Sequence, residues 1–463
     1  MPPIFRPRLF ALLLVAVLSF AAAGCGQGGR PTGDSAPTNA APTSQSAGAP
    51  PAETASSRPV ELTFFYPVGV TGPLTEIMNG LVEEFNRAYP GIRVKPVFTG
   101  NYADNTAKIV TALKGGNPPD VVISLSQDLA YLREIDAIQP FDDLFAKTDP
   151  ALRFDPQDFF PAFMLNSQME GKTWGIPFQR STPVMYYNKT ALKEAGLDPE
   201  KPPETWDELV DAAKKTMRRE NGKVARWGVE IPISGVSTWL FEALALEAGQ
   251  GLYDGDPTKV FVDTPAAKRA MQWLVDLSHR EGVMPEGVID WSAASTDFTA
   301  GKTVFLYHST GSLSAILKQA NFDVGVAFLP KDKQYGVPTG GGNFYILKGI
   351  PEAHKEAAWT FVQWMVSPEI AARWSIDTGY APVRKAATET DRWKQYVAER
   401  PQAEVALRQL EYAHPEFAPY QRPQVQKIVA DAIQAVLTGA ATVDDAFARA
   451  QQDADRILQK VAR

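Results

Sequence analysis

The run VELTFF at residues 60–65 begins the stretch of sequence that decides the fold. Its β-branched and aromatic residues favour a strand, and residues 74–89, which follow, have the apolar spacing of a helix. Pro90 and Gly91 break this helix, and residues 92–98 return to a strand pattern. This order of strand, helix and strand is typical of a unit whose two strands run parallel in one sheet.

The same alternation then repeats. Residues 103–113 have helical spacing that stops at Gly115 and Gly116, and the run DVVIS at 120–124 is apolar enough for a buried strand. No internal repeat of longer period is visible, so a solenoid is not indicated. We therefore predict an α/β protein with mainly parallel sheets that are flanked by helices on both faces.

The part of the chain after the first 59 residues is about 400 residues long, which is enough for two domains with sizeable cores. Helix starts recur within it. Thr205 and Glu208 fit a capping box, and a hydroxyl residue precedes proline at 264–265 and 367–368. The last forty residues predict two amphipathic helices.

The first 24 residues predict a secretory signal peptide. Arg6 and Arg8 precede an apolar run at 9–23, which is too short to span a membrane. The run ends in AAGC at 22–25, which resembles the lipobox of bacterial lipoproteins, where the cysteine is lipidated. Cys25 is the only cysteine in 463 residues, so the exported chain has no internal disulfide. The alternative is an ordinary alanine-rich cleavage site, because Ala22 stands where the lipobox usually has leucine.

Residues 26–59 contain none of the large aliphatic or aromatic residues, so they predict a disordered linker after Cys25. A flexible chain of this length reaches about 30 to 35 Å on average, which suits a tether between a membrane anchor and a globular body. Residues 1–59 hold four arginines and two acids and therefore carry a net charge of +2. Since the whole chain carries −7, the body from residue 60 onward carries −9. An acidic body without a basic stripe argues against nucleic acid as a partner.

Six short motifs follow one another along this body. They are Phe85-Asn86, Gly100-Asn101-Tyr102, PFQRSTPVMYYNK at 177–189, AGLDP at 195–199, Thr205-Trp206 and TGYAP at 378–382. In this order they resemble the extracellular solute-binding proteins of ABC importers, and most closely the glycerol-phosphate-binding branch. The resemblance covers nearly the whole chain after the linker. It implies a clamp of two lobes that closes over a ligand at their interface.

The resemblance also implies where the lobes begin and end. It places the changes of lobe near 178–183, 324–330 and 378–382. The predicted domains are a signal peptide at 1–24, a lipid-anchored linker at 25–59, a first lobe at 60–178 and 326–378, and a second lobe at 179–325 and 379–463.

Ligand contacts are implied at positions that match the family residue by residue. These are Tyr102, Ser181, Trp239, Ser309, Gly341 and Tyr380. Hydroxyl groups, exposed backbone amides and aromatic faces are what a polyol or a phosphate ester needs from a cleft. The glycines at 340–342 could also form only a loose turn.

Two further positions belong to the same set but differ from the family. Ser126 stands where the branch has a glutamate that binds the glycerol hydroxyls, and Gln426 stands where it has an arginine for the phosphate. Arg180, Arg384 and Lys427 could supply the missing cation, although each is interpreted as a solvated surface charge. The ligand is therefore expected to be glycerol-3-phosphate or a glycerophosphodiester, and an oligosaccharide stays the alternative.

An enzymatic function finds no support in the motifs. The four histidines, His279, His308, His354 and His414, lack metal-ligand spacing, and there is no Gly-x-Ser-x-Gly motif. The Gly-Lys-Thr triplets at 171 and 301 lack the earlier glycine of a phosphate-binding loop. We therefore predict no catalytic residue, no metal and no cofactor, with a secreted hydrolase or a protein-binding lipoprotein as remote alternatives.

The expected partners follow from the resemblance. They are a small polyol phosphate or sugar, the permease and ATPase of an ABC importer, and a membrane that is contacted through the lipid anchor alone. The protein is expected to be a monomer, exported and anchored on the outer face of the cell membrane.

Overall fold

The computed structural model describes residues 58–70, 72–234 and 237–461. The predicted signal peptide at 1–24, Cys25 and all of the linker before Arg58 lie outside the described residues. The body from Ser57 onward forms one compact unit. Within the described residues, no helix is both long enough and apolar enough to cross a membrane.

The first sheet begins as the sequence predicts. Its early elements are β1 (Val60–Tyr66), α1 (Leu74–Ala88), β2 (Ile92–Phe98), α2 (Tyr102–Lys114) and β3 (Val121–Leu125). Strand β1 pairs in parallel with both β2 and β3, which confirms the repeated alternation of parallel strands and helices. Helix α1 buries one face, with Leu74, Met78, Leu81, Val82 and Phe85 in the core.

The rest of the first sheet corrects the prediction of a mainly parallel sheet. Strand β14 (Gly340–Leu347) lies next to β3 and is antiparallel to it, and β4 (Ile138–Gln139) and β7 (Ile176–Ser181) are antiparallel to β14. The start of β14 pairs with the end of β3, because Gly342 lies opposite Leu125. The chain enters β14 from the second sheet, so this strand runs away from the edge at which β3 ends.

The second sheet is also mixed. Its order is β12 (Val324–Ala327), β8 (Pro183–Asn188), β11 (Thr303–Ser309), β10 (Lys223–Glu230) and β9 (Arg218–Glu220). Only β10 and β11 are parallel among these neighbours, and the other pairs are antiparallel. The predicted α/β class is confirmed, but both sheets are mixed rather than mainly parallel.

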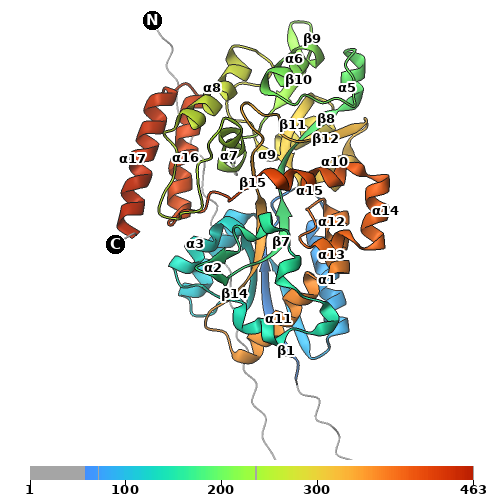
Figure 1. Cartoon of the computed structure of the whole chain (residues 1–463), viewed down its shortest axis with the longest axis vertical. Coiled ribbons are helices and arrows are strands. Elements are labelled where there is room, and N and C mark those ends of the chain that lie inside the picture. The colour runs from blue at the N-terminus through green and yellow to red at the C-terminus, as the bar shows by residue number, and fades with distance from the viewer. Residues whose placement is uncertain (1–57, 71, 235–236, 462–463) are drawn as a thin grey trace, which may run out of the picture. The chain divides into compact units, whose positions relative to one another are not determined.

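The chain passes between the sheets at two places that the strands define. Strands β7 and β8 are consecutive but belong to different sheets, so the chain crosses at Thr182 (Figure 1). It returns between β12 and β14. Strand β7 remains in the first sheet to Ser181, and β12 remains in the second sheet to Ala327. The division of the chain into lobes stays a prediction.

Helices cover both sheets. Around the first sheet lie α3 (Leu129–Glu134), α4 (Pro161–Met164), α11 (Glu352–Met365), α12 (Pro368–Thr378), α13 (Lys385–Thr388) and α14 (Asp391–Glu399). Around the second lie α5 (Lys189–Glu194), α6 (Trp206–Thr216), α7 (Ser237–Glu247), α8 (Pro265–His279), α9 (Trp291–Thr299), α10 (Leu313–Gln319), α16 (Arg422–Leu437) and α17 (Val443–Val461). Short connecting elements are β5 (Gln168–Met169), β6 (Lys172–Thr173), β13 (Val337–Pro338), α15 (Val405–Gln409) and β15 (Ala413–His414).

The predicted helix starts are found at their places. The capping box of Thr205 and Glu208 is complete, and the Thr264 hydroxyl accepts a hydrogen bond from the Ala267 amide. Helix α12 begins at Pro368, but Ser367 does not cap it, because its hydroxyl donates to the Trp364 carbonyl instead. The two amphipathic helices at the end of the chain are α16 and α17.

Two large apolar cores hold the body together. One contains residues of α1, α11 and α12 and extends to the second sheet, since Val184, Tyr186, Leu306 and Val324 of that sheet belong to it. The other joins α6, α7, α8, α16 and α17 on the second sheet, where Trp206 stacks on Trp273 with ring centroids 4.2 Å apart. One core thus reaches both sheets, and the two sheets provide the two-lobed frame on which a site between them can form.

Candidate ligand-binding site

Strand ends bring the predicted site residues to one edge of the first sheet. Strand β2 leads to Tyr102 at the start of α2, and β3 leads to Ser126 in a short 3-10 turn. The edge also holds the end of β7 at Ser181 and the start of β14 at Gly340. Strands that run toward this edge end there and the antiparallel β14 begins there, so residues far apart in sequence become neighbours.

Three glycines allow β14 to approach its neighbours closely. A Cβ atom at Gly341, whose φ is +90°, would lie 1.7 Å from the Gln179 carbonyl oxygen. A Cβ at Gly340 would lie 2.4 Å from the ring of Trp239 and 3.0 Å from the Ser181 Oγ. These residues belong to a paired strand rather than to a loose turn, and the space they leave is filled by β7 and Trp239.

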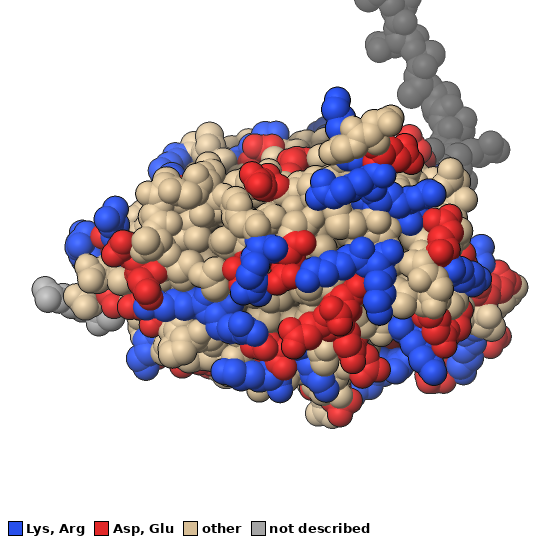
Figure 2. Space-filling model, turned by 90° about the horizontal axis from the view of Figure 1, so that it is seen from above, with Lys and Arg blue, Asp and Glu red and all other residues tan. Residues whose placement is uncertain are grey.

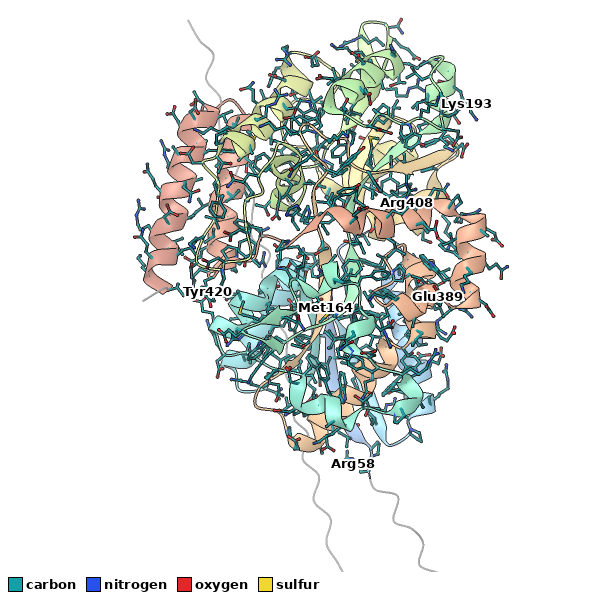
Figure 3. The ribbon with its side chains drawn as sticks, in the orientation of Figure 1. Arg58, Met164, Lys193, Glu389, Arg408 and Tyr420 are labelled. Atoms are coloured by element: carbon teal, nitrogen blue, oxygen red, sulfur yellow. The ribbon has the colours of Figure 1, made fainter. Side chains whose placement is uncertain are left out.

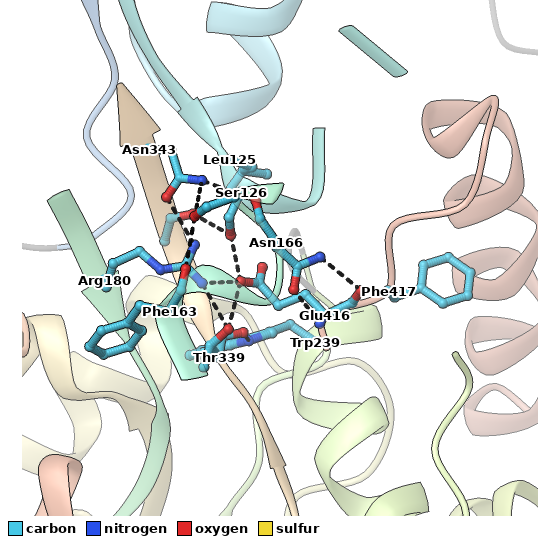
Figure 4. Close-up of polar contacts among 12 residues, drawn as sticks. Leu125, Ser126, Phe163, Asn166, Arg180, Trp239, Thr339, Asn343, Glu416 and Phe417 are labelled. Carbon is cyan, nitrogen blue, oxygen red and sulfur yellow. Dashed lines mark hydrogen bonds and ion pairs between the residues drawn. The ribbon is translucent and has the colours of Figure 1, made fainter. Parts of the chain in front are cut away.

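A buried ion pair stands at the centre of this edge. The Arg180 Nη2 donates to the Glu416 Oε1 across 2.8 Å, and the two side chains are 0% and 1% exposed. The same carboxylate oxygen accepts from the hydroxyls of Ser126 and Thr339, the latter at 3.1 Å (Figure 4). Burial raises the pKa of the Glu416 carboxyl above its ordinary value, and the charge of Arg180 opposes that rise.

Three buried polar atoms in this cluster have no hydrogen-bond partner within the described residues. They are the Oε2 of Glu416, the Nε of Arg180 and the Oε1 of Gln179. A buried polar group without a partner costs about 1 to 3 kcal/mol. The cluster can therefore gain stability from a ligand that both donates and accepts hydrogen bonds.

The two predicted tyrosines belong to the same cluster. The Tyr102 hydroxyl accepts a hydrogen bond from the Gln179 Nε2 at 3.2 Å and is also hydrogen-bonded to Tyr380. Burial raises the pKa of Tyr102 to about 12, so its hydroxyl is neutral at physiological pH. Ser309 lies close by, because its Oγ accepts from the Gly311 amide, and a Cβ at Gly311 would lie 2.9 Å from the Tyr380 ring.

A second chain of contacts leads from Trp239 to a second arginine. The indole Nε1 of Trp239 donates to the Thr339 carbonyl at 2.8 Å, and the neighbouring Thr238 hydroxyl accepts from the Gln426 Nε2 at 3.0 Å. The Gln426 Oε1 accepts from Arg422, which lies one turn earlier in α16. Arg422 also donates to the buried Asp128 carboxylate, with its Nε at 2.8 Å.

The interpretation of the three suggested cations is partly wrong. Arg180 and Arg384 are both buried rather than solvated, and only Lys427 is a surface charge, paired with Asp431. Arg384 donates to Asp158 and to two backbone carbonyls away from the cluster. Sequence spacing cannot reveal such burial, because it depends on contacts between residues more than 200 positions apart.

All eight predicted contact positions can now be placed. Six of them, Tyr102, Ser126, Ser181, Trp239, Gly341 and Tyr380, lie in or directly beside the Arg180–Glu416 cluster. Ser309 adjoins it through Gly311, and Gln426 joins it through Thr238 and Arg422. Neither of two surface hollows on the second lobe, one between α6 and α8 and one beside α17, is lined by any of the eight.

The sequence prediction missed four polar residues of the cluster, namely Glu416, Thr339, Asn343 and Asn166. Asn166 follows α4, which Met164 marks near the middle of Figure 3. Its side chain accepts from the Glu416 amide at 2.8 Å and donates to the Glu416 carbonyl at 3.3 Å. The one available signal was the isolated acid in the run AHPEFA at 413–418, between a strand and a helix.

Among the residues that the structure describes, no group of three or more His, Cys, Asp or Glu side chains is arranged to hold a metal ion. His308 is buried, which lowers its pKa to about 4, and it stacks on Trp291 with centroids 3.8 Å apart. Its Nδ1 is hydrogen-bonded to the Ser312 hydroxyl rather than to a carboxylate.

Comparison with known proteins gives consistent matches over most of the chain. The family model described as "Bacterial extracellular solute-binding protein" matches residues 80–401. The sn-glycerol-3-phosphate-binding periplasmic protein UgpB of Pectobacterium atrosepticum is 30% identical over 403 residues, which cover 84% of this chain and 89% of that protein.

Solved structures agree with this assignment. The crystal structure of UgpB from Mycobacterium tuberculosis in complex with glycerophosphocholine has a TM-score of 0.77 and 26% identity, and the match covers 88% of this chain and 100% of that one. An ABC transporter solute-binding protein from Thermotoga lettingae, bound with α-D-tagatose, shares the fold with a TM-score of 0.75 at 23% identity, over 86% and 100% of the two chains. The chain therefore belongs to the bacterial extracellular solute-binding proteins and is the exported substrate-binding component of an ABC importer rather than an enzyme.

Proposed function

We propose that this protein captures a glycerophosphodiester, or glycerol-3-phosphate, and delivers it to the permease of its importer. One observation carries the proposal: the positions that the glycerol-phosphate-binding branch implies form one connected set around two buried arginines. The names of the relatives and the glycerophosphocholine bound to the M. tuberculosis protein support the same ligand class.

Each part of a glycerophosphodiester has a matching group. The hydroxyls of Tyr102, Ser126, Ser181 and Ser309 and the amide of Gly341 are suited to the polar atoms of the ligand. Trp239 and Tyr380 offer aromatic faces for its carbon atoms and for a cationic headgroup. Gln426 and Arg422 offer donors for the phosphate, at the position where the branch has an arginine.

The charges around the site favour a phosphodiester over a phosphate monoester. Arg180 is paired with Glu416, and Arg422 is paired with Asp128, so neither guanidinium brings an uncompensated charge. A monoester carries close to two negative charges at neutral pH, whereas a diester carries one and a choline headgroup cancels it. Because burial of an uncompensated charge is costly, glycerophosphocholine is expected to bind more tightly than glycerol-3-phosphate.

An oligosaccharide is the second candidate. The same balance of charges would accept a neutral ligand, and a tagatose-bound protein shares the fold. Hydroxyl groups and aromatic faces also serve sugars, so the residues themselves do not exclude this class.

We further propose that Cys25 carries a lipid and that the protein works as a monomer on the outer face of the membrane. The lipobox-like run and the polar linker support the anchor. Figure 2 shows basic and acidic side chains interspersed over the visible face of the molecule. Such a mixed surface suits a protein that meets the membrane through its anchor rather than through a basic patch.

A calorimetric titration of the purified protein tests the ligand class. The panel is glycerophosphocholine, glycerol-3-phosphate, maltose and trehalose, with thermal unfolding as a second readout. A ligand present at a hundred times its Kd adds about 2.7 kcal/mol to the free energy of unfolding. Binding of glycerophosphocholine with weaker binding of glycerol-3-phosphate is expected, whereas binding of the sugars alone would replace the proposal with its second candidate.

A further inference from the structure

We propose that Glu416 is the carboxylate that accepts hydrogen bonds from the hydroxyl groups of the ligand. It comes from the loop between β15 and α16 and acts at the place that Ser126 leaves without an acid. This inference rests on the proposed function and adds a specificity-determining residue to it. It also fixes which end of a glycerophosphodiester lies at which end of the site.

The unused oxygen of Glu416 is the first argument. Its Oε1 accepts from Arg180, Ser126 and Thr339, but its Oε2 is buried and has no partner within the described residues. Nearby, the Oε1 of Gln179 is likewise buried and without a partner. Both atoms only accept hydrogen bonds, so the group that satisfies them must donate. A hydroxyl can donate, whereas the oxygens of a phosphodiester cannot.

The second argument is the contact between Glu416 and Ser126. The serine hydroxyl donates to the carboxylate, and it also lies 3.2 Å from the Gly341 carbonyl oxygen. The serine thus connects the carboxylate to the strand edge at which Tyr102 and Gln179 lie. The Glu416 carboxylate, which comes from the loop before α16, therefore lies where a glutamate at position 126 would place its own carboxylate.

The third argument is that Glu416 is held rigidly in place. Asn166 binds both the amide and the carbonyl of its backbone, and the next amide, of Phe417, donates to the Glu242 carboxyl at 3.1 Å. Asn343 in turn donates to the Asn166 carbonyl at 3.1 Å. A carboxylate fixed in this way needs little reorganisation when a hydroxyl binds, which is how a site gains selectivity.

Arg180 makes this role possible. Burial opposes the ionised form of Glu416, and the guanidinium 2.8 Å away favours it. The Arg180 Nε is itself buried and has no partner in the part of the chain that the structure describes, so a hydroxyl that donates to the Glu416 carboxylate can also accept from the guanidinium. The pair therefore suits neighbouring hydroxyl groups, such as those of a glycerol, and the phosphate lies toward Gln426 and Arg422.

The alternative is that the Arg180–Glu416 pair only stabilises the contact between the sheets. A thermodynamic cycle separates these roles, because it pairs a change in the protein with the removal of ligand hydroxyls. The ligands are glycerophosphocholine and propyl phosphocholine, which lacks both free hydroxyls. The proteins are the wild type, Glu416→Gln and the matched control Glu411→Gln, whose side chain is exposed five positions away.

Removal of the hydroxyls is expected to weaken binding to the wild type and to the control about 10- to 100-fold, the range for hydrogen bonds to a charged group. For Glu416→Gln the same removal is expected to weaken binding less than about threefold, because the hydroxyls have lost their charged acceptor. Equal losses in all three proteins would overturn the role of Glu416. Failure of the wild type to bind glycerophosphocholine at all would instead overturn the proposed function.

A second variant covers the case in which Glu416→Gln does not fold. Loss of one partner leaves Arg180 buried with its charge unpaired, which is strongly destabilising. The double variant Arg180→Met with Glu416→Gln removes both charges and avoids this penalty. It is expected to bind the two ligands with affinities that differ less than about threefold, and retention of the wild-type difference would overturn the inference.

Discussion

Two buried arginines of this protein, Arg180 and Arg384, differ in how far their hydrogen bonds are satisfied. Arg384 donates to Asp158 at 2.7 Å, to the Val366 carbonyl at 3.2 Å and to the Arg153 carbonyl, so each guanidinium nitrogen has a partner. Arg180 also faces a carboxylate, but its Nε has no partner within the described residues, and neither does the far oxygen of Glu416.

Under the proposed function, this difference separates a structural ion pair from one that binds the ligand. Arg384 joins the segments around Asp158 and Val366 beside the first sheet, and each of its guanidinium nitrogens already has a partner. Arg180 lies where the chain passes between the sheets. In its cluster one donor, the Arg180 Nε, and two acceptors, on Glu416 and Gln179, have no partner within the described residues. Burial alone therefore does not mark an arginine as a candidate for ligand binding, whereas unsatisfied hydrogen-bonding capacity at the interface does.

The largest effect is expected when the structural ion pair of Arg384 and Asp158 is broken. Arg384→Met leaves the Asp158 carboxylate without its cation and two carbonyls without donors, so the free energy of unfolding should fall by about 3 kcal/mol. Urea denaturation measures the loss, and calorimetry on the folded variant should give an unchanged Kd for glycerophosphocholine. A Kd that rises tenfold in this variant would show that the contrast between the two arginines is wrong.

A somewhat smaller effect is expected at the aromatic side of the site. Trp239→Ala removes a ring that lies against Gly340 and a donor to the Thr339 carbonyl. The affinity for glycerophosphocholine should fall by about 1 to 3 kcal/mol. Calorimetry measures this change, and Trp273→Phe is the control, because that ring stacks on Trp206 and lines the hollow between α6 and α8. Unchanged affinity in Trp239→Ala would place the ligand elsewhere.

A change in ligand preference is expected when the second ion pair loses its acid. Asp128→Asn leaves Arg422 with a net positive charge, so the doubly charged glycerol-3-phosphate should gain about tenfold in affinity relative to glycerophosphocholine. Ser124→Ala, which removes a hydrogen bond to the same carboxylate without altering charge, serves as the control. An equal preference between the two ligands in the variant and the control would show that Arg422 does not take part in phosphate recognition.

A change in the pH dependence of stability is expected from a buried acid. Glu230 is 2% exposed, and burial raises its pKa from 4.5 to about 8. The folded protein therefore holds a proton that the unfolded chain releases, and the resulting stability is present below pH 4.5 and is lost as the pH rises toward 8. The slope is at most about 1.4 kcal/mol per pH unit for a single group.

Urea denaturation between pH 5 and pH 8 tests this expectation. Glu230→Gln should weaken the decline in stability that the wild type shows over this range. Identical pH profiles for the two proteins would mean that Glu230 is ionised in the folded state.

The sequence predicted the local features of the fold well. The strands and helices between residues 60 and 125 follow from apolar spacing and from the breaks at Pro90 and Gly115, all of which act over a few residues. The antiparallel direction of β14 was missed, because it depends on a return of the chain from the other sheet. No local pattern encodes such a return.

The residues of the candidate site could be predicted only where a short sequence motif contained them. Tyr102 and Tyr380 belong to short motifs and Gly341 to a run of three glycines, and these residues lie close to one another. Glu416 stands in no such motif and meets Arg180 across 236 positions of sequence, so neither spacing nor composition could pair them. From the sequence, Ser126 and Gln426 therefore lacked the acid and the cation that the family has at these positions. In the structure, Glu416 contacts Ser126, and Arg422 contacts Gln426.

The most direct test is a crystal structure of this protein with glycerophosphocholine. A glycerol hydroxyl is expected within hydrogen-bonding distance of the Glu416 Oε2, with the phosphate on the side of Gln426 and Arg422. A ligand bound away from the Arg180–Glu416 pair, or one that places its phosphate at Glu416, would contradict the account.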